Sequence, residues 1–235
     1  MSLNTPAVVR SGNNLYRDPE LLDELMNDPS YTDRVLRLIG ADDLPARDVL
    51  DLGCGTGRVL AQIAQRRPNW RLHGVDFQTD LLLYAARRYP LIGWTEEDIR
   101  TLSLEMEFDA VTILGHSFSY LMDDHDVDAV LDVAMGHLRP GGLLVVHVLP
   151  EVRESPELIA TMQTCRGEVT LRTLATVNGR GRRLTTRSWT FHDSGVVWHD
   201  VFEQRAMSPG DLAARAQEVG FRSVPGDGDV LAFQA

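Results

Sequence analysis

The sequence is 235 residues long, 43% hydrophobic and acidic, with a formal net charge of −11, which suits one α/β domain with a full core. The acidic balance argues against a nucleic-acid partner, and the lack of an export signal or of an apolar run of bilayer-spanning length predicts no membrane partner. Because Cys54 and Cys165 lie far apart without a C-x-x-C motif, we expect neither a zinc site nor a disulfide framework, and a reduced, cytoplasmic setting.

The N-terminal 40 residues predict two helices after an irregular start. Pro19 is followed by an apolar run with Leu21 and Leu22, and proline is favoured at the first position of a helix. A second helical run contains Val35, and Gly40 is expected to end it.

Residues 48–60 predict a strand, a glycine-rich turn and a helix. Residues 48–52 read as a short buried strand, residues 53–57 have the sequence Gly-Cys-Gly-Thr-Gly, and apolar residues at helical spacing follow. Glycines allow the backbone to approach a ligand, and the first turn of a helix offers unpaired N–H groups to an anion. The stretch therefore predicts a cradle for a nucleotide-like ligand. An ordinary strand-turn-helix junction is the alternative.

Two details of the cradle indicate the ligand. Its spacing is G-x-G-x-G, and Arg58 stands where the dinucleotide fingerprint requires a third glycine. Asp51, at the mouth of the cradle, would repel a pyrophosphate but attract an ammonium or a sulfonium group. S-adenosylmethionine (SAM) carries both cations, and the stretch resembles the first motif of the class I SAM-dependent methyltransferases. The resemblance implies cofactor-binding roles for five residues: Asp51, Gly53, Cys54, Gly55 and Gly57.

The next two strands supply further cofactor contacts. Residues 71–76 predict the second strand, and Asp76 ends it about 20 residues after the glycine turn, where an acidic residue meets ribose hydroxyls in nucleotide-binding α/β folds. Asp76 followed by Phe77 matches the corresponding methyltransferase motif. Residues 91–94 predict a weak third strand. The resemblance then implies that Asp98 and Ile99 contact the adenine, with a plain acidic loop as the alternative.

The fourth predicted strand, residues 108–114, leads into the expected methyl-transfer site. Leu114 is assigned to the cofactor, and the loop after it should line the site because ligands bind beyond the carboxyl ends of parallel strands. His116 is the first candidate for a general base, with Ser117 and Tyr120 placed to orient the acceptor. His147, near the end of the fifth strand, is the second candidate. The other histidines considered are His192 and His199, and a structural or surface role is the alternative for each histidine.

The rest of the chain completes and extends the sheet. A helix, the sequence Leu-Arg-Pro-Gly-Gly and an apolar strand at residues 143–149 resemble the same family. Alternating apolar residues and the turn at Asn178-Gly179 then predict a three-stranded antiparallel meander. After it, a helix from residue 208, Gly220-Phe221 and a final strand pair also resemble the family, whose likeness covers residues 48–149 and 208–234.

We therefore predict an α/β fold with a Rossmann-like, mostly parallel seven-stranded sheet, helices on both faces and an antiparallel meander inserted after strand five. The predicted regions are an N-terminal helical lid at 1–40, a SAM-binding core at 41–150, the antiparallel insertion at 165–206 and the C-terminal completion of the sheet at 207–235. Within the lid, Tyr16 and Arg17 are expected to face the site, although residues 1–18 could equally be a surface tether. The insertion is expected to cover the acceptor or to form a homodimer surface.

The predicted function is metal-independent transfer of a methyl group from SAM to a nitrogen or oxygen of a small molecule, in secondary metabolism. The motifs of nucleic-acid amino methylation, of cytosine C5 methylation and of metal-dependent catechol methylation are missing after strand four, where the sequence reads Leu114-Gly115-His116-Ser117. The layout is similar to the amino-sugar N-methyltransferases, which favours an amine acceptor. The alternatives are a nicotinamide-dependent oxidoreductase and a non-catalytic SAM-binding regulator.

Overall fold

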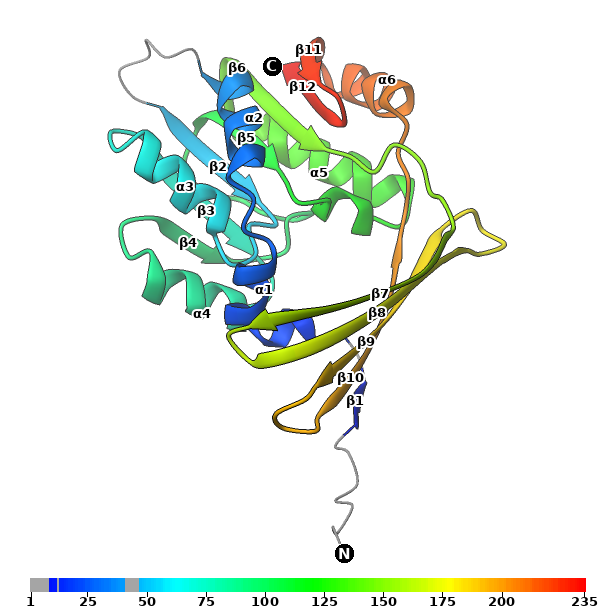
Figure 1. Cartoon of the computed structure of the whole chain (residues 1–235). Helices are drawn as coiled ribbons and strands as arrows, with labels where there is room; N and C mark the ends of the chain where they lie inside the picture. Colours follow the sequence, from blue (N-terminus) through cyan, green and yellow to red (C-terminus); the bar gives the residue numbers. More distant parts are fainter. Residues whose placement is uncertain (1–8, 12, 41–46) are drawn as a thin grey trace, which may run out of the picture. The chain divides into compact units, whose positions relative to one another are not determined.

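The computed structural model describes residues 9–11, 13–40 and 47–235, and they form two compact units (Figure 1). The first unit combines the described residues up to Met26 with Val152–Gln204, and the second combines Asn27–Glu151 with Arg205–Ala235. The N-terminal piece predicted as one lid at 1–40 is therefore divided after Met26, because its two helices belong to different units.

The second unit contains the predicted seven-stranded sheet, in the order β11-β12-β6-β5-β2-β3-β4 among the described residues. Its elements are α2 (Pro29–Ile39), β2 (Asp48–Leu52), α3 (Arg58–Arg66), β3 (Arg71–Asp76), α4 (Thr79–Arg88), β4 (Gly93–Glu96), β5 (Phe108–Ile113), η2 (Ser117–Tyr120), α5 (Asp124–Gly136), β6 (Leu138–His147), α6 (Pro209–Val219), β11 (Arg222–Asp227) and β12 (Val230–Gln234). The strands β4, β3, β2, β5 and β6 are parallel, and β12 pairs antiparallel with β6 and β11. The predicted Rossmann-like fold class is confirmed.

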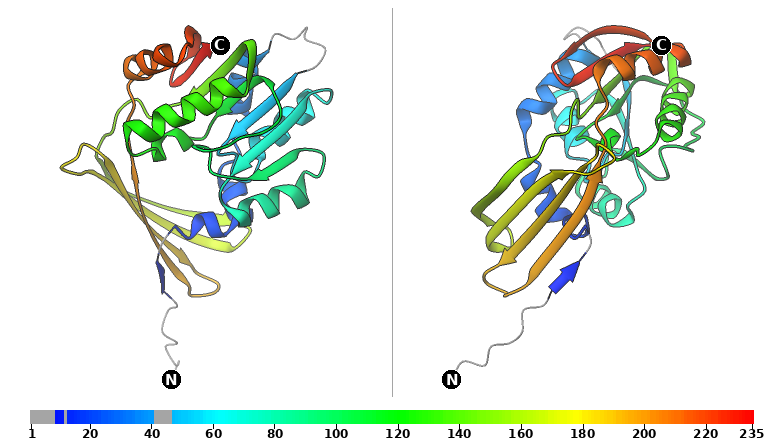
Figure 2. Two further views of the ribbon diagram at one scale, coloured as in Figure 1. Left: turned by 180° about the vertical axis from the view of Figure 1, so that it is seen from behind. Right: turned by 90° about the vertical axis from the view of Figure 1, so that its right-hand side faces the viewer.

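Helices cover both faces of this sheet. One face packs against α2 and α3 through apolar side chains such as Val35, Ile39 and Leu60, and Figure 1 looks onto that face. The opposite face packs against α5 and α6, where Leu131 and Leu212 are fully buried, and α5 lies in front of the sheet in the left view of Figure 2. Burial on both faces explains why the central strands read as continuous apolar runs.

Two strands of this sheet differ from the prediction in their bounds. The weak third strand was expected at residues 91–94, but β4 runs from Gly93 to Glu96 and Leu91 is 99% exposed. The fifth strand was expected at residues 143–149, whereas β6 begins at Leu138, ends at His147 and includes the Arg-Pro-Gly-Gly segment. A register shift against β5, between the pairs at Leu138 and Leu143, accommodates that segment as a bulge.

The first unit contains a five-stranded sheet in the order β1-β10-β9-β8-β7 among the described residues. Its elements are β1 (Val9–Ser11), η1 (Leu15–Arg17), α1 (Pro19–Leu25), β7 (Ser155–Thr164), β8 (Gly167–Val177), β9 (Arg183–Phe191) and β10 (Val197–Gln204). The antiparallel part has four strands and not the predicted three, because β7 was missed. β7 is an edge strand of this sheet, and its consecutive residues Leu158 and Ile159 are 59% and 50% exposed, so its sequence lacks the clean alternation that marks a strand.

The first unit has a buried polar centre. Asp200 is fully buried and accepts hydrogen bonds from the Asn14 amide N–H over 2.7 Å and from Trp189 Nε1 over 2.9 Å. Arg166, in the β7–β8 turn, binds the Asp18 carboxylate through two nitrogens at 2.8 Å each. Asp18 also caps α1. These contacts fasten η1 and α1 to the antiparallel sheet within this unit.

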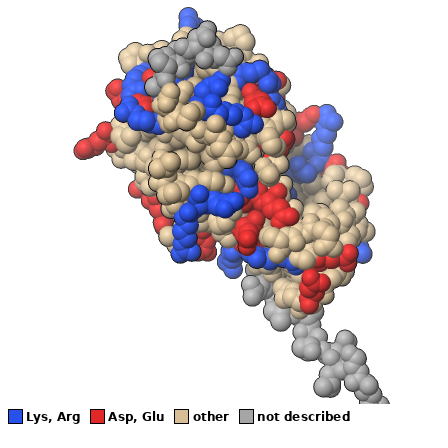
Figure 3. Space-filling view, turned by 60° about the vertical axis from the view of Figure 1, so that its left-hand side comes forward, with Lys and Arg blue, Asp and Glu red and all other residues tan. Residues whose placement is uncertain are grey.

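Charged side chains of both signs are interspersed on the face shown in Figure 3. Ion pairs between surface side chains include that of Arg100 with Asp126, at 3.1 Å. Across residues 9–11, 13–40 and 47–235, none of the helices has the length and apolar character that a membrane crossing requires.

Candidate functional site

The glycine turn between β2 and α3 adopts the conformation that only glycine takes readily. Gly53, Gly55 and Gly57 have φ angles of +77°, +55° and +72°, in the left-handed region that is costly for other residues. The N–H groups of Gly53 and Cys54 both donate to the Val75 carbonyl, over 2.8 and 3.0 Å. A Cβ atom added at Gly55 would meet no heavy atom within 4 Å. The turn is therefore an open cradle, as the sequence predicts.

The Trp94 ring, at the start of β4, packs against the backbone of the cradle. A Cβ atom on Gly57 would lie 2.2 Å from the Trp94 ring, and one on Gly74 would lie 2.5 Å from it and 2.8 Å from Cys54 Sγ. The indole Nε1 donates to the Tyr89 carbonyl over 3.3 Å. Close packing therefore requires glycine at both positions, and at Gly57 the left-handed φ angle requires it as well.

Asp51 is buried at the carboxyl end of β2. Its side chain is beside Thr112 because these residues are register partners in the β2–β5 pair, and Thr112 Oγ1 donates to Asp51 Oδ1 over 2.7 Å. Asp51 is only 2% exposed, and its burial raises the pKa of the carboxyl from 3.8 to about 7, with a further contribution from the negative charge of Asp76. The ionised form of Asp51 would be favoured by a cation placed at the cradle.

Asp76, at the end of β3, is hydrogen-bonded to the cradle. Its Oδ2 accepts from the Gly55 N–H over 2.8 Å and its Oδ1 accepts from the Gln78 N–H over 2.9 Å. Burial raises the pKa of this carboxyl above its ordinary value, against the effect of these hydrogen bonds. Phe77, the next residue, is 71% exposed. Both predicted residues are thus at the cradle-side edge of the sheet.

The residues predicted to contact adenine lie in the loop after β4. Arg100 holds the Asp98 carboxylate, with its Nη2 at 2.5 Å from Asp98 Oδ2, and also binds Asp126 on α5. Ile99 packs against the apolar cluster under α5. Asp98 therefore has a cationic partner within the protein that the sequence did not suggest.

The loop after β5 contains the predicted acceptor-side residues. Leu114 is buried, and it is followed by Gly115 and His116, which have φ angles of +61° and +63°. Among the described residues, His116 is the one non-glycine with a positive φ, and such strain is typical of functional positions. Ser117 Oγ donates to the Gly53 carbonyl over 3.1 Å, so it joins this loop to the cradle. Tyr120 ends η2 and is half-buried.

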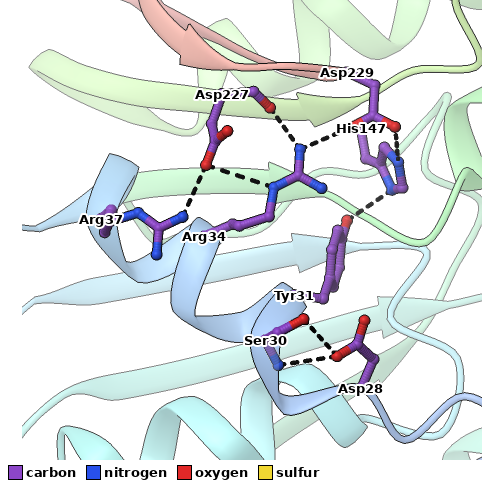
Figure 4. Close-up of polar contacts among 8 residues, drawn as sticks. All are labelled: Asp28, Ser30, Tyr31, Arg34, Arg37, His147, Asp227 and Asp229. Carbon is purple, nitrogen blue, oxygen red and sulfur yellow. Dashed lines mark hydrogen bonds and ion pairs between the residues drawn. The ribbon is translucent and has the colours of Figure 1, made fainter.

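The two candidate bases lie against each other. The rings of His116 and His147 have centroids 3.8 Å apart. His147 Nδ1 lies 2.9 Å from the Tyr31 hydroxyl, and His147 Nε2 lies 3.2 Å from Asp229 Oδ2 (Figure 4). The Tyr31 oxygen also accepts from the Gly115 N–H over 3.1 Å. Burial lowers the pKa of His147, against the opposing effect of the Asp229 charge.

Helix α2 is fastened to the β11–β12 turn beside these histidines. Arg34 lies one helical turn after Tyr31, and its Nη2 donates to Asp229 Oδ1 over 2.7 Å. Arg34 Nε and Arg37 Nη2 both approach Asp227 Oδ2, at 3.5 and 2.9 Å. Figure 4 shows these contacts around the turn. The ion pairs keep the Tyr31 side of α2 against the end of β6.

Sequence reasoning missed Tyr31, Asp229, Thr112 and Trp94. None belongs to a local motif, since each meets its partner through the sheet register or through packing of α2. The other predicted residues belong to the first unit. Tyr16 and Arg17 are in η1, His192 follows β9, and His199 is in β10. Their expected roles at the site stay predictions.

Comparison with known proteins shows which protein family this chain resembles. Residues 49–142 match a family model described as a methyltransferase domain. We refer to this matched segment, which is less than half of the chain, as the methyltransferase domain. It contains the cradle, both buried carboxyls and the loop of His116.

Curated relatives resemble the methyltransferase domain over part of their length. A trans-aconitate 2-methyltransferase of Azoarcus sp. is 32% identical over 114 residues, covering 48% of this chain and 43% of that protein. A dTDP-3-amino-3,6-dideoxy-alpha-D-glucopyranose N,N-dimethyltransferase of Streptomyces fradiae is 34% identical over 101 residues, covering 43% and 39%. The matched segments thus span less than half the length of these two relatives.

Solved structures share the fold over nearly the whole chain. CalS10, an amino pentose methyltransferase from Micromonospora echinaspora described with SAM bound, has a TM-score of 0.72 and 22% identity, covering 95% of this chain and 92% of that one. The sugar N-methyltransferase KedS8 from Streptoalloteichus sp. has a TM-score of 0.72 and 19% identity, covering 100% and 96%. The fold of the methyltransferase domain and of the additional sheet therefore occurs in other proteins.

Alanine at Gly57 should destabilise the methyltransferase domain by about 2 kcal/mol or more, since a left-handed φ costs about 1–2 kcal/mol and the new Cβ would clash with Trp94. Urea unfolding followed by tryptophan fluorescence measures this loss. Gly136→Ala is the control, because a Cβ at this helical glycine meets no atom within 4 Å. Equal stability of the two variants would contradict the packing of Trp94 under the cradle.

Replacing Asp51 by asparagine should make the slope of stability against pH more positive between about pH 4 and pH 7. The pKa of Asp51 is raised from 3.8 to about 7 in the folded protein, so the folded state binds more protons in this window. This contribution is complete at the acidic end and is lost as the pH rises to about 7, by at most about 1.4 kcal/mol per pH unit. Urea unfolding of the ligand-free proteins at several pH values measures the slope. Identical slopes in both proteins would refute the assignment to Asp51.

Proposed function

We propose that this protein is a SAM-dependent methyltransferase that methylates a nitrogen or oxygen of a small molecule. The observation that carries the proposal is the combination of an open glycine cradle with the buried carboxyl of Asp51 at its mouth. A methyltransferase domain over residues 49–142 supports it. The similarity to amino-sugar N-methyltransferases in both sequence and fold favours an amine acceptor. The similarity to a trans-aconitate 2-methyltransferase makes an oxygen acceptor the second candidate.

The residues at the cradle fit SAM. Asp51 is a buried carboxyl whose ionised form a nearby ammonium or sulfonium would stabilise. Gly55 leaves space beside the backbone N–H groups, and Asp76 keeps oxygen lone pairs for ribose hydroxyls. Phe77, Asp98 and Ile99 are the proposed neighbours of the adenosine. When bound, SAM supplies a methyl group already activated by the positive sulfur.

A nicotinamide dinucleotide fits the same residues poorly. The carboxyls of Asp51 and Asp76 both lie at the cradle, where a pyrophosphate would add negative charge. Burial already raises the pKa of each carboxyl, and the negative charge of Asp76 raises that of Asp51 further. A non-catalytic SAM-binding regulator would need the same cradle, and the strained His116 loop favours an enzyme over it.

The acceptor side is assigned to the loop after β5. Methyl transfer by in-line displacement depends mainly on positioning and on exclusion of water, and an acceptor that carries a proton also needs a group to receive it. We assign that role to an imidazole nitrogen of His116, and orientation of the acceptor to Tyr120. Ser117 holds the loop on the cradle through its bond to Gly53.

The first unit is proposed to complete the enzyme. Residues of η1, with Tyr16 and Arg17, are the proposed lid, and the antiparallel sheet of β7–β10 is the proposed acceptor cover. A homodimer surface on that sheet is the alternative to a cover.

Asp76→Ala should weaken SAM binding by about tenfold or more, because the hydrogen bonds that the buried carboxyl accepts from the ribose hydroxyls are lost. Isothermal titration calorimetry with SAM and with NAD measures both affinities, and thermal unfolding shows that the variant is folded. Tight NAD binding by the wild-type protein without heat from SAM would refute the proposed function. Unchanged SAM affinity in a folded Asp76→Ala variant would refute the ribose assignment only.

His116→Ala should lower turnover by about 100-fold while SAM affinity stays nearly constant, if the imidazole acts as a general base. The measurement is methyl transfer to a panel of amines and phenols, detected by mass spectrometry. Asp132→Ala, a change at an exposed residue on α5, is the matched control. Full turnover of the His116→Ala variant would indicate that positioning of an amine is sufficient.

A further inference from the structure

We infer that Tyr31 is a positioning residue that selects which of the two stacked histidines receives the proton of the acceptor. Through its contacts with Gly115 and His147, Tyr31 keeps His147 neutral and leaves proton uptake to His116. The inference rests on the proposed function for the identity of the reaction. The hydrogen-bond arrangement around Tyr31 can be tested whether or not the protein is a methyltransferase.

The direction of each hydrogen bond around Tyr31 follows from its partners. The backbone N–H of Gly115 can only donate, so the Tyr31 oxygen accepts it over 3.1 Å. We assign the phenolic proton to the contact with His147 Nδ1 over 2.9 Å, which leaves Nδ1 unprotonated and agrees with the lowered pKa of the buried His147. The hydrogen of a neutral His147 is left on Nε2, where it is donated to Asp229 Oδ2 over 3.2 Å. His147 is therefore held in a single tautomer.

Other charged groups around His147 do not reverse this preference. Asp229 would favour a second proton on His147, but its other oxygen is bound by Arg34 over 2.7 Å, and the Arg34 charge opposes that proton. Tyr31 stays in its neutral, donating form because burial raises the pKa of its phenol. The remaining neighbour is His116, whose ring lies 3.8 Å from that of His147.

Because the two histidine rings are in close contact, the protonation state of His147 affects the basicity of His116. Two positive imidazolium rings at 3.8 Å would repel each other strongly in a partly buried site. A neutral His147 instead presents an uncharged ring to His116 when His116 takes a proton. If His147 were protonated first, His116 would lose much of its basicity. Tyr31 thus acts on the base through its neighbour.

Tyr31 also supports the backbone that carries His116. Gly115 and His116 are consecutive left-handed residues, a conformation that is strained for a non-glycine residue such as His116. The Tyr31 oxygen binds the N–H of the first of them. The Ser119 hydroxyl binds the carbonyl of the second over 2.7 Å. The turn is thus held from both sides, with Tyr31 as the contact from α2.

The test compares Tyr31→Phe with the wild-type protein and with Tyr89→Phe, a matched control on another partly buried tyrosine that packs against the same apolar cluster. ¹⁵N NMR of the histidine side chains reports the tautomer and protonation of His147 directly. In the wild-type protein and in Tyr89→Phe, His147 should be the neutral Nε2–H form across pH 6–8. In Tyr31→Phe it should populate the Nδ1–H and protonated forms. The same His147 spectrum in all three proteins would overturn the inference.

Kinetics give the second readout. In Tyr31→Phe, kcat should fall about fivefold to tenfold, as expected for one lost hydrogen bond, with the KM for SAM unchanged. The acidic limb of the kcat/KM profile should move to higher pH by about half a unit or more, because His147 then competes for the proton. A parallel fall in activity at all pH values would indicate a purely structural role and would overturn the inference.

Two variants of His147 separate the hydrogen bond from its titration. In His147→Asn, the amide oxygen can accept the Tyr31 proton but cannot titrate, whereas His147→Leu removes the acceptor. His147→Asn should keep at least about fivefold more kcat than His147→Leu. Equal losses in both variants would overturn the positioning role. If the wild-type protein transfers no methyl group, the proposed function fails, while the NMR result still decides the role of Tyr31 in the tautomer of His147.

Discussion

The site depends on the register of the parallel strands β3, β2, β5 and β6. Parallel pairing places all their carboxyl ends at one edge of the sheet, and the register brings Asp51 beside Thr112. Val146 pairs with Ile113, so His147 comes to lie beside the loop that follows β5. Side chains from four separate segments therefore meet at one edge, although none is close to another in the sequence.

Two buried carboxyls at that edge give the cradle its electrostatic character. Burial without a cationic partner disfavours the charged form of a carboxyl, which is why the pKa values of Asp51 and Asp76 are raised. Such an arrangement opposes folding at neutral pH unless a cation shares the site. The same cost makes the cradle selective, because a positively charged ligand relieves it and a diphosphate would increase it. Stability and ligand preference therefore have one physical origin.

The acceptor side of the edge is shaped by α2 and the β11–β12 turn. Arg34 and Asp229 join these two segments, and Tyr31 extends from the same face of α2 to Gly115 and His147. A helix near the N-terminus and a turn near the C-terminus thus hold a loop from the middle of the chain. This support explains how His116 is kept in a left-handed conformation at a site that chemistry requires to be rigid.

The sequence by itself determined the parts of this protein that depend on neighbouring residues. Strand 48–52, the glycine cradle with Asp51 and the acid at Asp76 were predictable, because periodicity, turn chemistry and motif spacing are local properties. Only the tertiary structure decided which of the remaining side chains face one another. It revealed Tyr31 against His147 and an additional strand, β7, an edge strand whose exposed apolar residues do not show the alternation that sequence analysis needs. The physical reason is that register and helix docking are set by packing between distant segments, and a single sequence does not display that packing.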